Sequence, residues 1–321
     1  MSLTEIIQKQ LPLSVHDYMQ LCLQHPEHGY YRKAAAVGKE GDFITAPEIS
    51  QIFGDLIGLW FRDIWQQSGE GEVVLVELGP GRGTLSSDIL RHFKPSELHL
   101  VESNETLRDV QAKLLWQHSP QWHDSIELLP SKRPLFIIAN EFFDAFPIRQ
   151  WVGDEERMVN EDFKFIPEGK VTREECPQAK EIIAQICQRL KAQGGVLLMA
   201  DYGYAEGEQG GTLQAVKNHA YANPLEDCGK ADLTSHLDFQ ALAKVAKEEG
   251  CVASSVVEQE KFLRSLGGEV WLQKLLTKTP DIGQQKTLLE GWMRLISPAQ
   301  MGTLFKLMAI TPDDSLTLGG F

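Results

Sequence analysis

Three glycines alternate with other residues directly after an apolar run in the segment "VELGPGRGTL". The glycines are Gly79, Gly81 and Gly83. The acid Glu77 precedes them on the run, and glycine lets a backbone approach a ligand closely. A dinucleotide fingerprint needs its third glycine one place later, where this chain has Thr84. The spacing instead predicts a turn that holds S-adenosylmethionine (SAM), with the carboxylate of Glu77 facing its amino group or the polar network nearby.

Two more segments suit the same ligand. Glu102 ends the apolar run "LHLVE", where an acid can bind both ribose hydroxyls. In "GDFITAPEIS", Asp42 or Thr45 is predicted to cap a helix that covers the cofactor, with Glu48 in its first turn. Helix capping alone also explains Glu48. The expected cofactor-binding residues are Glu77, Gly79, Gly81, Gly83, Glu102, Thr45 and Glu48.

The segment "NEFFDAFP" carries an amide and two acids directly after the apolar run 134–139. In an open parallel sheet ligands lie beyond the carboxyl ends of the strands, and this strand is predicted to end beside the glycine turn. Asn140 and Glu141 then lie next to the methyl group of SAM. A carboxylate binds a guanidinium with two hydrogen bonds, aligns its nitrogen and favours loss of its proton. Arginine is therefore the acceptor that this segment suits most.

Simpler explanations exist for each of these polar residues. Asn140 and Asp144 could cap a following helix, with Glu141 a solvated acid in its first turn. Asp201 follows the apolar run 196–200 as a second acid at the same rim, and it either positions substrate or only forms a turn. The expected catalytic residues are Asn140, Glu141, Asp144 and Asp201.

Short apolar segments alternate with helical segments from Val73 onward, which is typical of a parallel α/β sheet. Residues 1–68 are predicted to form an N-terminal helical cap and residues 69–321 the core. The core is interrupted by a β-like flap at 149–178 and a largely helical insert at 262–298. The predicted strands are 73–78, 98–102, 125–130, 134–139, 196–203, 251–258 and 303–311.

Two of these elements rest on short patterns. The segment "SIELLP" (125–130) is interpreted as the third strand. The segment "LTSHLDFQALAKVAKEEG" is interpreted as a helix whose capped start is Thr234 or Ser235.

Composition narrows the class of protein further. The net charge of −14, from 31 basic and 45 acidic residues, opposes sequence-independent binding to nucleic acid. No run of about 18 apolar residues is present, so no membrane span is expected. The five cysteines show no C-x-x-C spacing, which indicates a reducing compartment. Cys22, His25 and His28 are spaced by threes, but Pro26 breaks the helix that would align them, so no metal site is expected.

Several long blocks resemble the MidA family of SAM-dependent methyltransferases. They are "SVHDYMQLCLQHPEHGYY", "GDFITAPEISQIFGDLIGLW", "VELGPGRGTL", "NEFFDAFP", "ADYGY", "ADLTSHLDF" and "MGTLFKLMAI", in that order along nearly the whole chain. The resemblance implies an α/β, class I SAM-dependent methyltransferase fold: a Rossmann-like seven-stranded sheet with an N-terminal helical extension and helical inserts. It also implies that the glycine turn and Glu102 hold the cofactor, and that Asn140 and Glu141 face the acceptor.

Mitochondrial members of the family assemble respiratory complex I and symmetrically dimethylate an arginine of one subunit. The resemblance therefore implies a protein-arginine N-methyltransferase whose substrate is a protein, with a complex I subunit as one candidate. We expect it in the bacterial cytoplasm, or in the mitochondrial matrix if the source is eukaryotic. Two alternatives remain open: a small-molecule or O-methyltransferase, and a SAM-binding assembly chaperone without turnover. The Asn140–Glu141 pair speaks against the chaperone, which has no need of an acceptor site.

Overall fold

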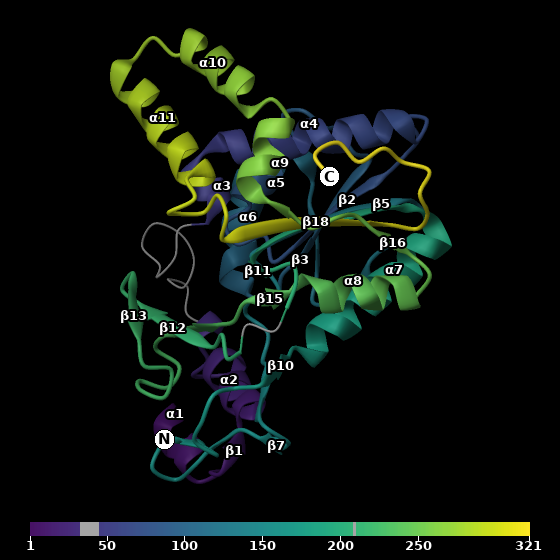
Figure 1. The fold of residues 1–321 in the computed structure, drawn as a ribbon. Helices are drawn as coiled ribbons and strands as arrows, with labels where there is room; N and C mark the ends of the chain where they lie inside the picture. The colour runs from purple at the N-terminus through teal and green to yellow at the C-terminus, as the bar shows by residue number, and fades with distance from the viewer. Residues whose placement is uncertain (33–44, 208–209) are drawn as a thin grey trace.

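The computed structural model describes residues 1–32, 45–207 and 210–321, and its centre is a mixed sheet (Figure 1). Its strands are β2 (Val74–Leu78), β3 (Glu97–Val101), β4 (Gln121–His123), β5 (Leu135–Asn140), β11 (Gly195–Tyr204), β15 (Leu237–Asp238), β16 (Val252–Ala253), β17 (Val257–Glu258) and β18 (Phe305–Thr311). The main path runs β4-β3-β2-β5-β11-β18-β16, with β15 beside β11 and β17 beside β18. Strand β18 is antiparallel to its neighbours. The strands β4, β3, β2, β5 and β11 pair in parallel, each with the next. The predicted Rossmann-like α/β fold is confirmed; seven strands form the main path of the sheet, and β15 and β17 bring it to nine.

Helices cover both faces of this sheet because side chains alternate between the faces along each strand. On β5, Phe136 and Ile138 pack in one apolar cluster, while Ile137 and Ala139 pack in the other. The second face is covered by α7 (Pro177–Gln193) and α8 (Phe239–Glu248). The helices linked to the first face are α3 (Ala46–Ile49), α4 (Gln51–Gln67), α5 (Thr84–Ile89), α6 (Glu105–Leu115), α9 (Gln259–Ser265), α10 (Gly268–Lys278) and α11 (Ile282–Ile296).

The third strand was expected at 125–130, and this prediction is wrong. That segment holds the short 3-10 helix η3 (Ile126–Leu128), and β4 lies before it. Ile126 and Leu129 are both buried. A spacing of three puts them on one side of a helical turn, whereas a strand would point them to opposite faces. The sixth strand is present as two pieces, β16 and β17, which both pair with β18.

The helix expected from Thr234 or Ser235 begins later. α8 starts at Phe239, and the side chain of Asp238 accepts a hydrogen bond from the amide of Ala241 at 2.9 Å. Thr234 belongs instead to β14 (Asp232–Thr234), because pairing with a neighbouring strand satisfies its backbone.

A second lobe lies below the sheet in Figure 1 and has an apolar cluster of its own. Its helices are α1 (Leu3–Gln8), α2 (Val15–Gln24) and the 3-10 helix η1 (Tyr30–Arg32). The segment between Arg149 and Glu175 consists of short strands, and α7 begins at Pro177. The lobe's strands are β1 (Leu13–Ser14), β6 (Arg149–Val152), β7 (Glu155–Glu156), β8 (Met158–Val159), β9 (Phe165–Ile166), β10 (Arg173–Glu175), β12 (Gln214–Lys217), β13 (Ala220–Ala222) and β14.

The N-terminal 68 residues divide between these two parts of the molecule. α1 and α2 pack with the flap strands, whereas α3 and α4 pack on the sheet. The insert at 262–298 is helical, as expected: it holds most of α9 and all of α10 and α11, which project from the top of the molecule in Figure 1. Within the described ranges, no helix is long and apolar enough to cross a membrane.

Candidate active site

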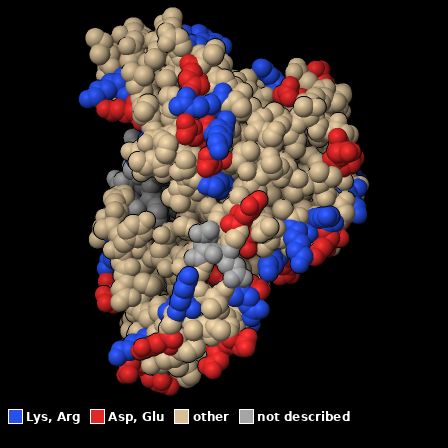
Figure 2. Space-filling view, in the orientation of Figure 1, with Lys and Arg blue, Asp and Glu red and all other residues tan. Residues whose placement is uncertain are grey.

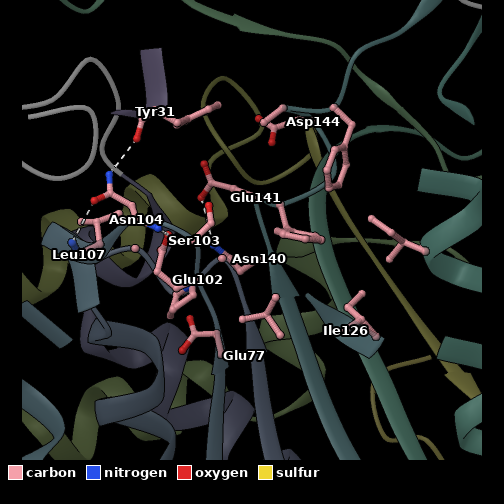
Figure 3. Close-up of a pocket in the computed structure, with 18 of the residues that line it drawn as sticks. Tyr31, Glu77, Glu102, Ser103, Asn104, Leu107, Ile126, Asn140, Glu141 and Asp144 are labelled. Atoms are coloured by element: carbon pink, nitrogen blue, oxygen red, sulfur yellow. Dashed lines mark hydrogen bonds between the residues drawn. The ribbon is translucent and has the colours of Figure 1, made fainter. Parts of the chain in front are cut away.

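A cavity of about 630 Å³ opens at the carboxyl ends of β2, β3 and β5, between the sheet and the lower lobe (Figure 3). Its size is in the usual range for small-molecule sites. Two predicted site residues, Gly83 and Asp201, do not line it. The predicted residues that do line it are Thr45, Glu48, Glu77, Gly79, Gly81, Glu102, Asn140, Glu141 and Asp144.

The glycine turn adopts a backbone that only glycine tolerates well. Gly79 has φ 62° and Gly83 has φ 83°, both in the left-handed region. A Cβ atom at Gly79 would lie 2.8 Å from Cδ2 of Phe142, which belongs to the segment after β5. The turn therefore packs directly against the predicted acceptor segment. Gly83 lies at the start of α5 and shapes the turn from outside the cavity.

Glu77 lies buried beneath the turn. Its Oε2 accepts hydrogen bonds from the amide of Ser86, at 3.1 Å, and from the Ser86 hydroxyl. Burial raises the pKa of Glu77 to about 8, and the Ser86 bonds oppose that rise only in part. Glu77 therefore contacts a nearby polar group, the Ser86 amide and hydroxyl.

The buried side chain of Gln111 joins the glycine turn to Glu102. Gln111 is not among the residues that the sequence predicted for the site. Its Nε2 donates to the carbonyl of Gly81 at 2.7 Å and lies 3.4 Å from Oε2 of Glu102. Its Oε1 accepts from the indole of Trp122 at 2.8 Å. The other carboxylate oxygen of Glu102 accepts from the amide of Asn104 at 2.8 Å. Both oxygens of Glu102 are therefore held in place.

A signal for Gln111 was present in the sequence. It shares one face of α6 with Leu107 and Leu115, at a spacing of four residues. A glutamine in an otherwise apolar row must find partners when the row is buried. Such a position is a reasonable search target in other sequences.

The short helix α3 contacts both the segment after β5 and the residue that follows the glycine turn. Thr45 makes no side-chain cap, and Asp42 lies outside the described residues. The amide of Ala46 instead donates to Oε1 of Glu141 at 3.2 Å. Glu48 accepts a hydrogen bond from the hydroxyl of Thr84 at 2.5 Å, next to the glycine turn. Glu48 thus does more than stabilise its own helix.

The capping explanation for the segment after β5 is wrong. Residues 141–148 form turns that lead to β6, and no helix begins there. Glu141 has φ 50°, a left-handed backbone, and its amide donates to the carbonyl of Ala200 at 2.9 Å. The segment therefore turns sharply and presents the side chains of Glu141 and Asp144 to the cavity (Figure 3).

Of the two acids of this turn, Glu141 is half-buried and Asp144 is buried. Burial, followed by repulsion from Asp144, raises the pKa of Glu141 to about 8. Burial also raises the pKa of Asp144 to about 6. Asn140 donates through Nδ2 to Oε1 of Glu141 at 3.3 Å, while its buried Oδ1 has no hydrogen-bond partner among the residues the structure describes. A cation with N–H donors would satisfy all three groups.

Asp201 lies beneath this turn and not at the rim of the cavity, where we expected it. Only 1% of it is exposed. Its Oδ2 accepts from the amides of Phe143 and Asp144 at 3.0 and 3.3 Å, and its Oδ1 accepts from the amide of Tyr202 at 2.9 Å. Asp201 therefore holds the turn after β5 in shape.

The lower lobe contributes Tyr31 and Asp232, which the sequence did not point to. The Tyr31 hydroxyl donates to Oδ1 of Asp232 at 2.8 Å, and both residues line the cavity. Asn104, at the start of α6, donates to the carbonyl of Tyr31 at 2.8 Å. Tyr31 and Asp232 are 201 positions apart, and only the folded chain brings them together.

A Rossmann-like sheet, a glycine turn after its first strand and a cavity above the strand ends together define a SAM-dependent methyltransferase. The Methyltransf_28 family model, which describes SAM-dependent methyltransferases, matches residues 56–167 and 158–257. This chain belongs to that group of enzymes, and within it to the MidA family.

Relatives and solved structures agree with this placement. Protein arginine methyltransferase NDUFAF7, mitochondrial, from Homo sapiens is 34% identical and covers 97% of this chain and 82% of its own. The Rattus norvegicus protein of the same name is 35% identical, with 96% and 83% covered. A Burkholderia thailandensis protein crystallised with S-adenosyl-homocysteine has a TM-score of 0.83 at 24% identity, covering 98% of this chain and 92% of that one. A native structure from the same organism has a TM-score of 0.81 at 25% identity, covering 99% and 92%.

Proposed function

We propose that this SAM-dependent methyltransferase methylates an arginine side chain of a protein. The observation that carries the proposal is the group of Asn140, Glu141 and Asp144, which lines the same cavity as the glycine turn. One half-buried and one buried acid with raised pKa values, together with an unpaired amide oxygen, form a site for a cation that has several N–H donors. The guanidinium group fits that description.

SAM supplies the methyl group on its sulfonium, and the side chains of the enzyme prepare the acceptor. Glu141 pairs with the guanidinium and directs one nitrogen toward the glycine turn. Asn140 Oδ1 accepts a further N–H. Because burial raises the pKa of Glu141 to about 8, this carboxylate is a stronger base than an exposed one and can take the proton released from nitrogen.

The part of the cavity beside the glycine turn is proposed to hold the cofactor. Gly79 and Gly81 leave room for close approach, and Glu102 is held in place to bind the ribose hydroxyls. Glu77 lies beneath the glycine turn, where the Ser86 amide donates a hydrogen bond to its carboxylate. Thr45 and Glu48 line the same cavity from α3.

The names of the relatives support the choice of acceptor. Proteins 33–35% identical to this chain, from mammals to Drosophila melanogaster, are named mitochondrial protein arginine methyltransferases or homologues of them. On the family resemblance we propose further that the substrate is a subunit of respiratory complex I. The place of action is then the mitochondrial matrix in a eukaryote and the cytoplasm in a bacterium.

The test is label transfer from radiolabelled SAM to proteins extracted from cells that lack the enzyme, followed by acid hydrolysis. Label in methylated arginine is the expected result. Label confined to small metabolites, or to base-labile protein esters, would identify a small-molecule or O-methyltransferase instead. SAM binding without any transfer would identify an assembly chaperone.

A further inference from the structure

We propose that the β12–β13 hairpin, with Tyr221 at its centre, binds the segment of the substrate protein that flanks the acceptor arginine. This inference rests on the proposed function and extends it to a docking surface. The hairpin consists of β12 (Gln214–Lys217) and β13 (Ala220–Ala222) in the lower lobe.

Strand register connects Tyr221 to the cavity. Val216 of β12 pairs with Tyr221 on one side and with Asp232 of β14 on the other. Residues directly opposite in antiparallel strands point to the same face of a sheet. Asp232, Val216 and Tyr221 therefore form one row, and Asp232 lines the cavity at its inner end.

The opposite face of this small sheet is occupied. Ala215 and Leu233, which pair with each other, are buried in the apolar cluster of the lower lobe. The face that carries Asp232 is therefore the one turned away from that cluster and toward the cavity. Tyr221 stands at the outer end of this face.

Tyr221 is exposed to an unusual degree for an aromatic side chain. Its exposed fraction is 82%, whereas Val216 beside it is 7% exposed. β13 is an edge strand whose partner among the described residues is β12. Asp232 and Val216 are buried, and Tyr221 is therefore the exposed end of the row.

Figure 1 places the hairpin on the left flank of the molecule, below α11. Figure 2, in the same orientation, shows the surface hollowed on this flank between the upper and lower parts.

The spacing suits an extended substrate segment. Two strand spacings separate the backbones of Tyr221 and Asp232, about 10 Å, which equals about three residues of extended chain. Tyrosine is frequent among the residues that dominate binding energy, because its ring offers a large rigid surface and its hydroxyl a polar contact. The row from Asp232 to Tyr221 therefore spans about three residues of extended chain, and we assign to Tyr221 a contact with the substrate segment that flanks the arginine.

The experiment uses the full chain and the proteins of an extract from cells that lack it. Initial rates of label transfer into arginine are measured against extract concentration for wild type, Tyr221→Ala and Tyr221→Phe. Trp116→Ala is the matched control, because Trp116 is an exposed aromatic (68%) that does not line the cavity. Calorimetric titration with S-adenosylhomocysteine and a thermal melt report on the cofactor site and the fold.

Tyr221→Ala is expected to raise the apparent KM for protein about tenfold with kcat unchanged, while Tyr221→Phe and Trp116→Ala stay within about twofold of wild type. Affinity for S-adenosylhomocysteine stays the same in all variants. Equal rates for Tyr221→Ala and wild type would overturn the docking surface and leave the proposed function intact. Absence of labelled arginine with the wild-type enzyme would instead remove the proposed function, and this inference with it.

Discussion

The carboxylate of Glu141 accepts a hydrogen bond from the amide of Ala46 at 3.2 Å, across 95 positions of sequence. Ala46 is the first residue of α3, and a negative charge is favoured at a helix N-terminus. On the same helix, Glu48 is bonded to Thr84 beside the glycine turn. One short helix therefore links the proposed acceptor acid to the proposed cofactor turn.

Glu141→Gln is expected to lower methyl transfer at least about 100-fold, which is roughly 3 kcal/mol of lost transition-state stabilisation. The amide keeps an oxygen for Ala46 but loses the charge that pairs with a guanidinium. Affinity for S-adenosylhomocysteine, measured by calorimetry, should stay within about threefold. Glu290→Gln on the exposed side of α11 is the control. Full activity of Glu141→Gln would show that the acceptor assignment is wrong.

The pH dependence of activity follows from the same carboxyl group. Its pKa is about 8 because it is buried, and only the ionised form pairs with the cationic acceptor. We expect kcat/KM for the protein substrate to rise with pH through an apparent pKa near 8. In Glu141→Gln this rise should disappear from whatever activity remains. A wild-type profile that is flat between pH 6.5 and 9 would contradict this role.

Stability should show the opposite trend with pH. The folded pKa of Glu141 is about 8, above its ordinary value of 4.5, so the unfolded chain loses this proton first. The free energy of unfolding therefore falls as pH rises from about 4.5 through 8. Glu141→Gln has no such proton, so without ligand it should melt a few degrees above wild type at pH 8.5 and closer to wild type at pH 5. Thermal melts at both values decide it, and an equal difference at both would contradict the assigned shift.

Gly79→Ala is expected to weaken binding of S-adenosylhomocysteine at least tenfold. The added Cβ would lie 2.8 Å from Phe142, on a backbone with φ 62°, so the turn must shift. Gly71→Ala offers a matched control, because a Cβ there would have no atom within 4 Å. Calorimetry on both variants makes the comparison. Equal affinities would mean that the turn does not shape the cofactor site.

Asp201→Ala tests a positioning residue. It removes the acceptor for the amides of Phe143 and Asp144, so the turn that carries Glu141 should loosen. We expect kcat/KM for the protein substrate to fall at least tenfold while affinity for S-adenosylhomocysteine is kept. Asp201→Asn retains a carbonyl oxygen and should recover much of the loss. If Asp201→Asn is as impaired as Asp201→Ala in an equally stable protein, the charge of Asp201 matters and not its hydrogen bonds.

Local sequence patterns predicted the elements that depend on local physics. The apolar runs correspond to β2, β3, β5, β11 and β18. A strand made of consecutive apolar residues is stable where other elements cover both faces of its sheet. The predictions for two short segments were wrong. In 125–130 the spacing of buried residues was that of a turn, and near Thr234 strand pairing competed with helix formation. Short patterns fit more than one structure, so tertiary contacts decide between them.

The sequence by itself determined the family, most of the sheet strands along the chain and the residues that meet at the strand ends. Parallel strands bring their carboxyl ends to one edge, so Glu77, Glu102 and Glu141 had to come near each other. Only the tertiary structure decided which acids face the cavity. It placed Asp201 beneath the turn and brought Tyr31 and Asp232 to the cavity from the lower lobe. These outcomes depend on packing between segments far apart in sequence, which no local pattern records.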